Sequence, residues 1–471
     1  MRVIIVAMLV LLCCGIGGGK AEAQPGQPDP QQEQVAFESD GVTLHGAVYR
    51  PTGDGPHPGI VLIGGSGPGP RAEYHPEAAA FARAGITTLV VDKRTVGYST
   101  SHRDFSVLAD DALAGVRLLR DRPDVDAAHV GLWGFSEGGW VATLAASRSS
   151  TVGFVVTIGG SGLTPLRTQT WYLSNLLRRN GVSGHLPDAV SGPGAAVVDG
   201  LGAFPEADYD PVPALRQVRV PVLALWGDHD VKVPSSESAA IFQHELAAAG
   251  NHSVTTRFVP NAGHNGHRTT DGFDSVGGEL FDGKPLGELD PGYTDVMTDW
   301  IHTVAADQAP PTSAATLPQQ PAGRAPGTHP DLEYAALAAL LLGFATYPLS
   351  ALSRRMLRRS PSKVGRGPHR AAQAVSAIGL LATLGIVTYV VGILAVGGKL
   401  PPTAFTLGQP LPWLLLHALA LAVPITAAIL AQSVWRARAR MDAPLRRQTL
   451  VLLATAMAFV PWALHWQLFS R

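Results

Sequence analysis

Three side chains in this sequence have the types and the setting that nucleophilic acyl transfer requires, and the first of them is Ser136. It stands in the run Gly134-Phe-Ser-Glu-Gly138, between a predicted strand and a predicted helix. Glycines on both sides allow the tight turn that lifts a serine hydroxyl clear of a sheet. The helix directs its first N–H groups at developing negative charge, so we expect the N–H of Glu137 to bind an oxyanion. The alternative is a strand-to-helix turn without chemistry.

A glycine-rich loop follows an earlier predicted strand and could supply a second oxyanion donor. The strand covers residues 59–63, and the loop runs Gly64-Gly-Ser-Gly-Pro-Gly69. A flexible loop at this point can present a backbone N–H, and we expect that of Ser66 to do so. The alternative is a phosphate-binding loop. No Gly-Lys-Ser or Gly-Lys-Thr follows, which disfavours a nucleotide.

An acidic motif and a histidine each follow a predicted strand further along the chain. Asp228 and Asp230 both follow the strand at 220–226, and a carboxylate there could orient an imidazole. We favour Asp230, because an aspartate directly after a glycine, as at position 228, is typical of a turn. His264 follows the next predicted strand and would take the serine proton and then return it to the leaving group. His267 is the alternative base.

The three groups occur in the chain order Ser136, Asp230, His264, which is the order of serine hydrolases that carry a G-x-S-x-G turn. The reaction they predict is two-step transfer of an acyl group to water through an acyl-serine, and it needs no cofactor. Together with His252 and His267, His264 could instead suggest a metal site. These histidines lack the helical spacing and acidic partner of zinc sites, so we expect no metal.

Alternating strands and helices surround these motifs. The predicted strands cover residues 35–39, 42–49, 59–63, 86–91, 129–133, 152–158, 220–226 and 254–259. Predicted helices cover residues 76–84 and 105–120. Several strands are continuous apolar runs, as in a sheet that is covered on both faces. The pattern predicts an α/β fold with a doubly wound, mostly parallel sheet, whose ligand site lies beyond the carboxyl ends of the strands.

These motifs resemble the α/β-hydrolase superfamily, and more narrowly its esterase and serine-aminopeptidase-like branch. Gly65-Ser-Gly-Pro68 is similar to the oxyanion loop of that branch. Val91-Asp-Lys-Arg94, followed by Gly97-Tyr-Ser99, is similar to its Asp-x-Arg-Gly-x-Gly-x-Ser loop. The resemblance covers residues 35–304 and implies an α/β-hydrolase fold for them.

Two positions depart from the pattern of the branch, and both lie beside the expected cleft. Gly64 stands where relatives commonly have histidine, and Thr95 stands where they have glycine. The resemblance also implies that residues 163–219 are a cap insertion. Its apolar side chains at 171–173 and 176–177 could roof an acyl pocket, or could simply pack on the core.

The N-terminus has the pattern of a cleavable secretory signal. A short apolar run ends in Ala21-Glu-Ala23, a small-x-small site, so we expect residues 1–23 to be removed. A lipoprotein signal is the alternative, but the residues before Cys13 and Cys14 are not the small ones that lipidation needs. These are the only two cysteines, so no thiol or disulfide would remain after cleavage. Residues 24–34 are then expected to form a disordered, Pro/Gln-rich tether.

The C-terminal third of the chain differs in composition. Residues 305–331 are expected to form a Pro/Ala-rich linker, and residues 332–471 a domain of four helices. The four apolar stretches lie at about 332–352, 374–397, 411–434 and 449–467, and each is near the length that spans a bilayer. Arginines concentrate in the first and third connections, which the positive-inside rule assigns to the cytoplasm. We therefore expect a transmembrane bundle; core helices of a soluble domain are the alternative.

The net charge of −1 gives no sign of a nucleic-acid partner. Together these features predict a serine hydrolase that cleaves carboxylic esters and is anchored in the cell membrane with its catalytic domain on the extracytoplasmic side. Its expected partners are a small ester or peptide substrate and the lipid bilayer. The alternatives are a peptidase-like or aminopeptidase-like amide hydrolase, a non-catalytic sensor or binding module on a degenerate hydrolase fold, and a transport bundle that a hydrolase serves.

Overall fold

The chain divides into two compact units in a computed structural model. Unit 1 comprises Met1–Gln169 and Phe204–Gly323, and unit 2 comprises Thr170–Ala203 and Arg324–Arg471. The structure describes residues 30–99, 101–281, 283–308, 310, 312–320, 329–357, 365–398 and 405–469. The predicted signal peptide, residues 24–29 of the predicted tether and residues 358–364 of the first arginine-rich connection lie outside the described residues.

Unit 1 is built on an eight-stranded sheet with the order β1-β2-β4-β3-β5-β6-β7-β8. Its strands are β1 (Gln31–Ser39), β2 (Val42–Arg50), β3 (His57–Ile63), β4 (Thr87–Val91), β5 (Val125–Phe135), β6 (Val155–Ile158), β7 (Val222–Gly227) and β8 (Val254–Val259). The first hairpin and the pairing of β2 with β4 are antiparallel, and all other neighbours are parallel. The predicted mostly parallel sheet is confirmed.

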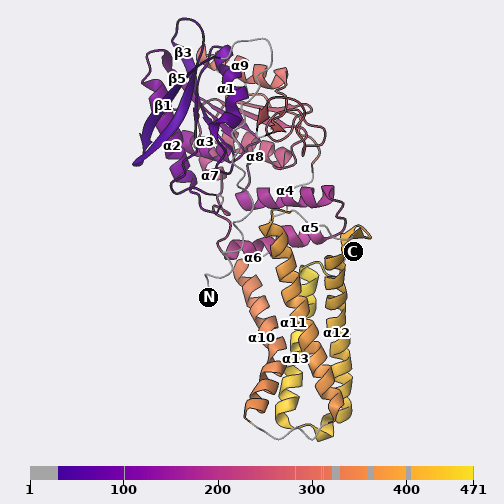
Figure 1. Ribbon diagram of the computed structural model, residues 1–471. Helices are drawn as coiled ribbons and strands as arrows, with labels where there is room; N and C mark the ends of the chain where they lie inside the picture. The colour runs from indigo at the N-terminus through magenta and orange to yellow at the C-terminus, as the bar shows by residue number, and fades with distance from the viewer. Residues whose placement is uncertain are drawn as a thin grey trace. The chain divides into compact units, whose positions relative to one another are not determined.

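Helices cover both faces of this sheet (Figure 1). They are α1 (His75–Arg83) and α9 (Pro291–Ala305) on one face, and α2 (Phe105–Arg120), α3 (Glu137–Arg148) and α8 (Ser235–Ala248) on the other. Successive side chains of β3 enter opposite cores, because strand residues alternate between faces. Val61 packs with α2 and α3, whereas Ile60 and Leu62 pack with α1 and α9. The doubly covered sheet explains the continuous apolar strands in the sequence.

Two predicted irregular segments of unit 1 are more ordered than expected. Strand β1 begins at Gln31, so residues 31–34 of the predicted tether pair with residues 47–50 of β2. In the predicted linker, Ser313 pairs with Thr255 of β8. Residues 31–34 thus pair with backbone groups of β2, and Ser313 pairs with backbone groups of β8, that would otherwise lack hydrogen-bond partners in the sheet.

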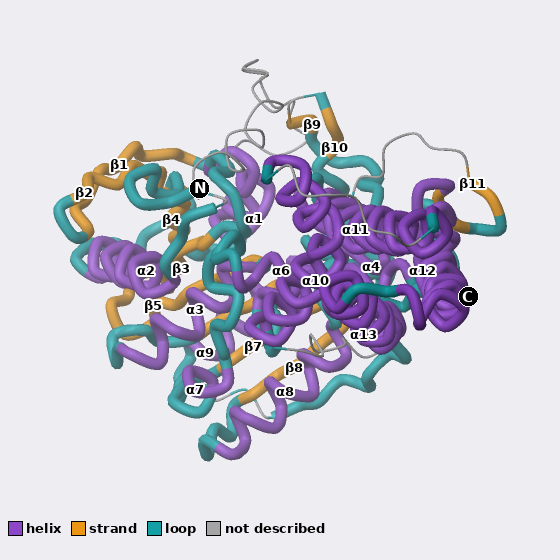
Figure 2. Tube along the Cα trace, turned by 90° about the horizontal axis from the view of Figure 1, so that it is seen from below, coloured by secondary structure: helices purple, strands orange, loops and turns teal. Residues whose placement is uncertain are grey.

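Unit 2 contains four long helices, which Figure 1 shows running alongside one another. They are α10 (Pro330–Met356), α11 (Arg366–Ala395), α12 (Leu411–Ala437) and α13 (Ala443–His465). All four are long and apolar enough to cross a membrane. In both Figure 1 and Figure 2, α11 and α12 lie side by side. The four predicted apolar stretches therefore all form helices, as expected.

The middle of the predicted cap insertion belongs to unit 2. After α4 (Pro165–Arg179), the chain forms α5 (Leu186–Ala189), the π-helical segment η3 (Val190–Gly194) and α6 (Ala195–Gly200). These short helices share one apolar core with the long ones: Leu186, Val190 and Val197 are buried with Leu340 and Val390.

The predicted insertion boundaries, 163–219, therefore differ from the observed division, because residues 163–169 and 204–219 lie in unit 1. The apolar side chains at 171–177 also have a different environment from a pocket roof. Leu173 and Leu177 are buried in the core of unit 2, and Gly398 at the end of α11 leaves room for Leu173. These leucines are packing residues of unit 2.

Candidate active site

Ser136 lies on a strained turn between β5 and α3. Its backbone has φ 54° and ψ −112°, a conformation that costs a non-glycine residue free energy and occurs mostly at functional sites. The glycines of the motif allow close backbone packing here. A Cβ on Gly134 would lie 2.1 Å from the carbonyl oxygen of Gly138, and a Cβ on Gly138 would lie 2.2 Å from that of Ile63. No other residue type fits these two positions without moving the turn.

His264 and Asp230 form a buried hydrogen-bonded pair. Nδ1 of His264 lies 2.9 Å from Oδ2 of Asp230, and both side chains are almost completely buried. The other oxygen of Asp230 accepts the backbone N–H groups of Lys232 at 2.8 Å and Val233 at 3.0 Å. This carboxylate is thus held from both sides and fixes the orientation of the imidazole.

Asp228 has a different partner and takes no part in this pair. Its Oδ1 lies 2.7 Å from Nδ1 of the neighbouring His229, and both side chains are more than a third exposed. Of the two aspartates that the sequence left in competition, the structure brings Asp230 against His264.

Ser136 and His264 both lie against the backbone at the end of β6, at Ile158 and Gly159. The N–H of Ser136 donates to the carbonyl of Ile158 at 2.8 Å, and the imidazole of His264 packs against the next residue, Gly159. A Cβ on Gly159 would lie 2.7 Å from Nδ1 of His264, and the ring of Phe135 lies 5.1 Å from the imidazole ring. Within the described part of the chain, no hydrogen bond joins the Ser136 hydroxyl to His264. Such contacts commonly tighten only when substrate binds.

His267, the alternative base, is engaged elsewhere. Its Nε2 lies 2.7 Å from Oε1 of Glu77 on α1, and its Nδ1 lies 2.9 Å from the carbonyl oxygen of Leu286. Burial alone would lower the pKa of His267, but the Glu77 carboxylate and the hydrogen bonds outweigh it and raise that pKa. Both ring nitrogens of His267 lie against oxygen atoms of other groups, so neither nitrogen is available to take a serine proton.

The glycine-rich loop leaves one backbone donor free. The N–H of Gly65 donates to the Tyr74 hydroxyl, and that of Gly67 donates to the Tyr98 hydroxyl, each at 2.9 Å. Among the residues that the structure describes, the N–H of Ser66 between them has no partner. The N–H of Glu137 is also free of a helical partner, because it is the first of α3. Both expected oxyanion donors are therefore available.

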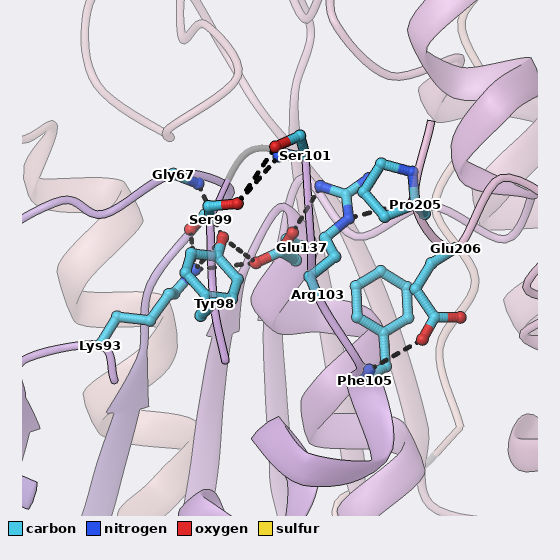
Figure 3. Close-up of polar contacts among 11 residues, drawn as sticks. Gly67, Lys93, Tyr98, Ser99, Ser101, Arg103, Phe105, Glu137, Pro205 and Glu206 are labelled. Atoms are coloured by element: carbon cyan, nitrogen blue, oxygen red, sulfur yellow. Dashed lines mark hydrogen bonds and ion pairs between the residues drawn. The ribbon is translucent and has the colours of Figure 1, made fainter. Parts of the chain in front are cut away.

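The side chain of Glu137 is the centre of a buried polar network that the sequence did not predict (Figure 3). Its Oε1 accepts from Lys93 Nζ and from the Tyr98 hydroxyl, both at 2.8 Å, and its Oε2 accepts from Arg103 Nη1 at 2.8 Å. Only 1% of the Glu137 side chain is exposed. Burial lowers the pKa of Lys93, but the adjacent carboxylate opposes that shift. Lys93 and Tyr98 lie in the segments that resemble the loop of the hydrolase branch, and Arg103 lies just beyond them, but that resemblance does not indicate a partner for Glu137.

Arg103 extends this network to the point where the chain returns from the insertion. Its Nε donates to the carbonyl oxygen of Pro205 at 3.3 Å, and the N–H of Phe105 donates to Oε1 of Glu206 at 3.1 Å. Figure 3 shows Arg103 lying between Glu137 and Pro205. The return segment is thereby tied to the helix that begins after Ser136.

Across the described residues, no group of three or more His, Cys, Asp and Glu side chains could hold a metal ion. What the site offers is a strained serine, a nearby imidazole held by a carboxylate, and two free backbone donors on neighbouring loops. That set can transfer an acyl group through a covalent serine intermediate.

Comparison with known proteins gives one family. Residues 77–276, which include Ser136, Asp230 and His264, match the prolyl oligopeptidase family. The thiohydrolase apmlB of Arthrinium phaeospermum is 34% identical over 131 residues, covering 27% of this chain and 42% of that protein. The esterase EstD of Thermotoga maritima is 26% identical over 262 residues, covering 48% of this chain and 59% of that protein. The chain thus spans about half the length of the curated relatives that it matches.

A solved structure with a related fold is that of 2,6-dihydroxy-pseudo-oxynicotine hydrolase. It is 18% identical to this chain, with a TM-score of 0.41, and the match covers 62% of this chain and 73% of that one.

Proposed function

Unit 1 is an α/β-hydrolase of the esterase and peptidase-like branch, and from this premise we propose that the chain is a serine hydrolase that cleaves carboxylic esters. Ser136 attacks the carbonyl carbon while His264 takes its proton, and Asp230 stabilises the imidazolium that forms. The free N–H groups of Ser66 and Glu137 bind the oxyanion, and water then cleaves the acyl-enzyme. The observation that carries the proposal is the buried His264–Asp230 pair beside the strained turn of Ser136.

The direct test combines a nucleophile variant with a fluorophosphonate probe that labels activated serines. Ser136→Ala should abolish both the labelling and the hydrolysis of short acyl esters, because no other group on the turn can form the acyl-enzyme. Equal hydrolysis by this variant would overturn the proposal. If the unaltered chain is not labelled at all, the fold serves binding rather than catalysis.

The two aspartates of the 226–231 motif provide a matched pair of variants. Asp230→Asn should lower kcat by about 10,000-fold, because the amide no longer holds the imidazole in the required tautomer. Asp228→Asn should leave kcat within about twofold, since that carboxylate is more than a third exposed and pairs with the neighbouring His229. A large loss in Asp228→Asn with none in Asp230→Asn would reassign the third residue.

A peptide amide is the second candidate substrate, and the match to the prolyl oligopeptidase family favours it. The same serine, histidine and aspartate can cleave either bond, and the fold does not select between them. A matched pair of substrates that differ only in the scissile bond separates the two candidates. Hydrolysis of the ester alone supports the first choice, whereas a kcat/KM for the amide equal to that for the ester identifies a peptidase.

The four long helices of unit 2 are long and apolar enough to support a membrane anchor. We propose that unit 1 lies on the extracytoplasmic side, from the positions of the arginines and the predicted secretory signal. Arginines gather where α10 and α12 end and where α11 and α13 begin, so one side of the bundle is basic. Because the chain has only two cysteines, both near its N-terminus, single cysteines can report topology. An impermeant maleimide should label Ala314→Cys on intact cells, and Arg440→Cys only after permeabilisation. The reverse pattern would invert the orientation.

A further inference from the structure

The two proposed oxyanion donors lie on different loops, and a single buried network connects those loops. The N–H of Glu137 belongs to the turn after β5, and the N–H of Ser66 belongs to the loop after β3. A tetrahedral intermediate needs both donors at hydrogen-bonding distance from one oxygen at the same time. Some element must therefore hold the two loops in register.

Tyr98 bridges the two loops through its hydroxyl. This oxygen accepts the N–H of Gly67 at 2.9 Å and donates to Oε1 of Glu137 at 2.8 Å. It also lies 3.2 Å from Lys93 Nζ, which fills its second acceptor position. Burial raises the pKa of the Tyr98 hydroxyl, so it keeps the proton that it donates to Glu137.

Lys93 also connects the loop that carries Ser66 to Glu137, through the peptide group that precedes Ser66. Its Nζ donates to the carbonyl oxygen of Gly65 and, at 2.8 Å, to Oε1 of Glu137. The peptide groups on both sides of Ser66 are thus bound, one by Lys93 and one by Tyr98, and both of these side chains bind Glu137. Figure 3 shows Tyr98, Lys93 and Arg103 gathered at the Glu137 carboxylate.

The network also brings charged groups together away from water. Lys93 and Arg103 both bind the Glu137 carboxylate, each at 2.8 Å. All three side chains are at least nine-tenths buried, so water screens their field weakly. The charges of the network therefore act with little screening on the two loops that the network joins.

We propose that Tyr98, Lys93 and Arg103 are positioning residues that act through Glu137 to hold the two oxyanion donors in register. This assignment rests on the proposed function of the same site. The network adds little to stability, because buried ion pairs seldom repay the cost of removing their charges from water. Its contribution is to the geometry of the donors, and it should therefore appear in kcat rather than in KM.

The test uses the full chain with Tyr98→Phe, which removes one hydroxyl and keeps the ring. We expect kcat per labelled serine to fall by about 10-fold to about 100-fold, with KM within about twofold. The affinity for an alkyl boronic acid, which forms a tetrahedral anion on the serine, should fall by the same factor. Tyr209→Phe is the matched control, because the Tyr209 hydroxyl is buried in the same unit and has no hydrogen-bond partner among the residues that the structure describes. It should change neither quantity.

A second variant keeps the assignment falsifiable if Tyr98→Phe does not fold. Lys93→Met removes the charge, keeps most of the stem, and should weaken boronic acid binding while fluorophosphonate still labels Ser136. Unchanged kcat and boronic acid affinity in either folded variant would overturn the positioning role and leave the proposed hydrolase intact. Equal activity of Ser136→Ala and the unaltered chain would instead overturn the proposed function.

Discussion

The interiors of the two units are both apolar, but they differ in how many ionisable side chains they bury. Unit 1 buries ionisable groups in pairs and networks around its candidate site, including Glu137 with Lys93 and Arg103, and Asp230 with His264. The core of unit 2 is formed by aliphatic and aromatic side chains from α5, η3, α6 and the four long helices. Among the described residues of unit 2, the buried carboxylate is that of Glu333 on α10, which pairs with His465 at the end of α13. Buried ionisable groups are therefore concentrated around the proposed chemistry of unit 1, and in unit 2 they lie at one end of the helix bundle.

The surfaces of the two units also differ, and here unit 2 is the one with the unusual composition. Large apolar side chains are exposed along all four long helices of unit 2, among them Leu342, Leu352, Leu381, Leu415, Ile425, Ile429, Leu450 and Met457. Unit 1 exposes only scattered ones, such as Val96 and Val276. An apolar exterior around an apolar core is the arrangement expected of helices in lipid. Substitutions inside each unit should therefore have separable effects.

The largest effect is expected from Gly134→Ala in unit 1. Its new Cβ would lie 2.1 Å from the carbonyl oxygen of Gly138, so the backbone around Ser136 must move. Because a shift of about 1 Å at a reacting group costs about 100-fold in rate, we expect at least that loss in kcat/KM. Gly263→Ala is the control, since its Cβ would meet Thr269 at an ordinary 3.5 Å. Equal activities of the two variants would show that the turn is not constrained as described.

An intermediate effect, confined to unit 2, is expected from Gly194→Ala in η3. The added methyl would lie 2.4 Å from Cγ1 of Val390 on α11, and relieving that overlap should cost about 1–3 kcal/mol. Gly192→Ala is the matched control, because nothing lies within 4 Å of its Cβ. Hydrogen exchange in residues 186–200 should accelerate only in Gly194→Ala. Equal exchange in both variants would contradict the shared core.

The smallest effect is a pH dependence of stability in unit 1. The raised pKa of His267 means that the folded chain binds a proton which the unfolded chain has lost above the ordinary histidine pKa of about 6.5. The stabilisation is complete below about pH 6.5 and declines as the pH rises through the raised pKa, by at most about 1.4 kcal/mol per pH unit. The urea concentration that abolishes half of the ester hydrolysis should fall as the pH rises through this range. The His267→Gln variant should not show that fall. An equal decline in both proteins would assign it to other groups.

The sequence predicted those features of the site that follow from strand ends. Ser136 comes directly after β5, and Asp230 and His264 lie in the loops that follow β7 and β8. The carboxyl ends of parallel strands meet at one edge of a sheet. The network around Glu137 was not predictable in this way. Lys93 and Glu137 are 44 positions apart, and which of several basic side chains meets a given carboxylate depends on packing.

The packing partner of segment 163–219 was likewise not predictable from the sequence. The amphipathic character of segment 163–219 indicates that it buries an apolar face, but not against which partner. That partner includes α10 and α11, which come much later in the chain; the Tyr334 hydroxyl, for example, donates to the carbonyl of Val197 at 2.6 Å. Periodicity identifies elements, whereas such contacts between distant segments are decided by three-dimensional packing.

The shared core of unit 2 has a consequence for how the protein is made. The ribosome completes α5, η3 and α6 before it has synthesised β7, β8, α8, α9 and the first long helix. Throughout that interval the apolar faces around Val190 and Val197 have no native partner. A nascent chain at this stage needs a chaperone or a lipid surface to shield them, and a chain truncated before α10 keeps those faces uncovered and becomes a substrate for quality-control proteases.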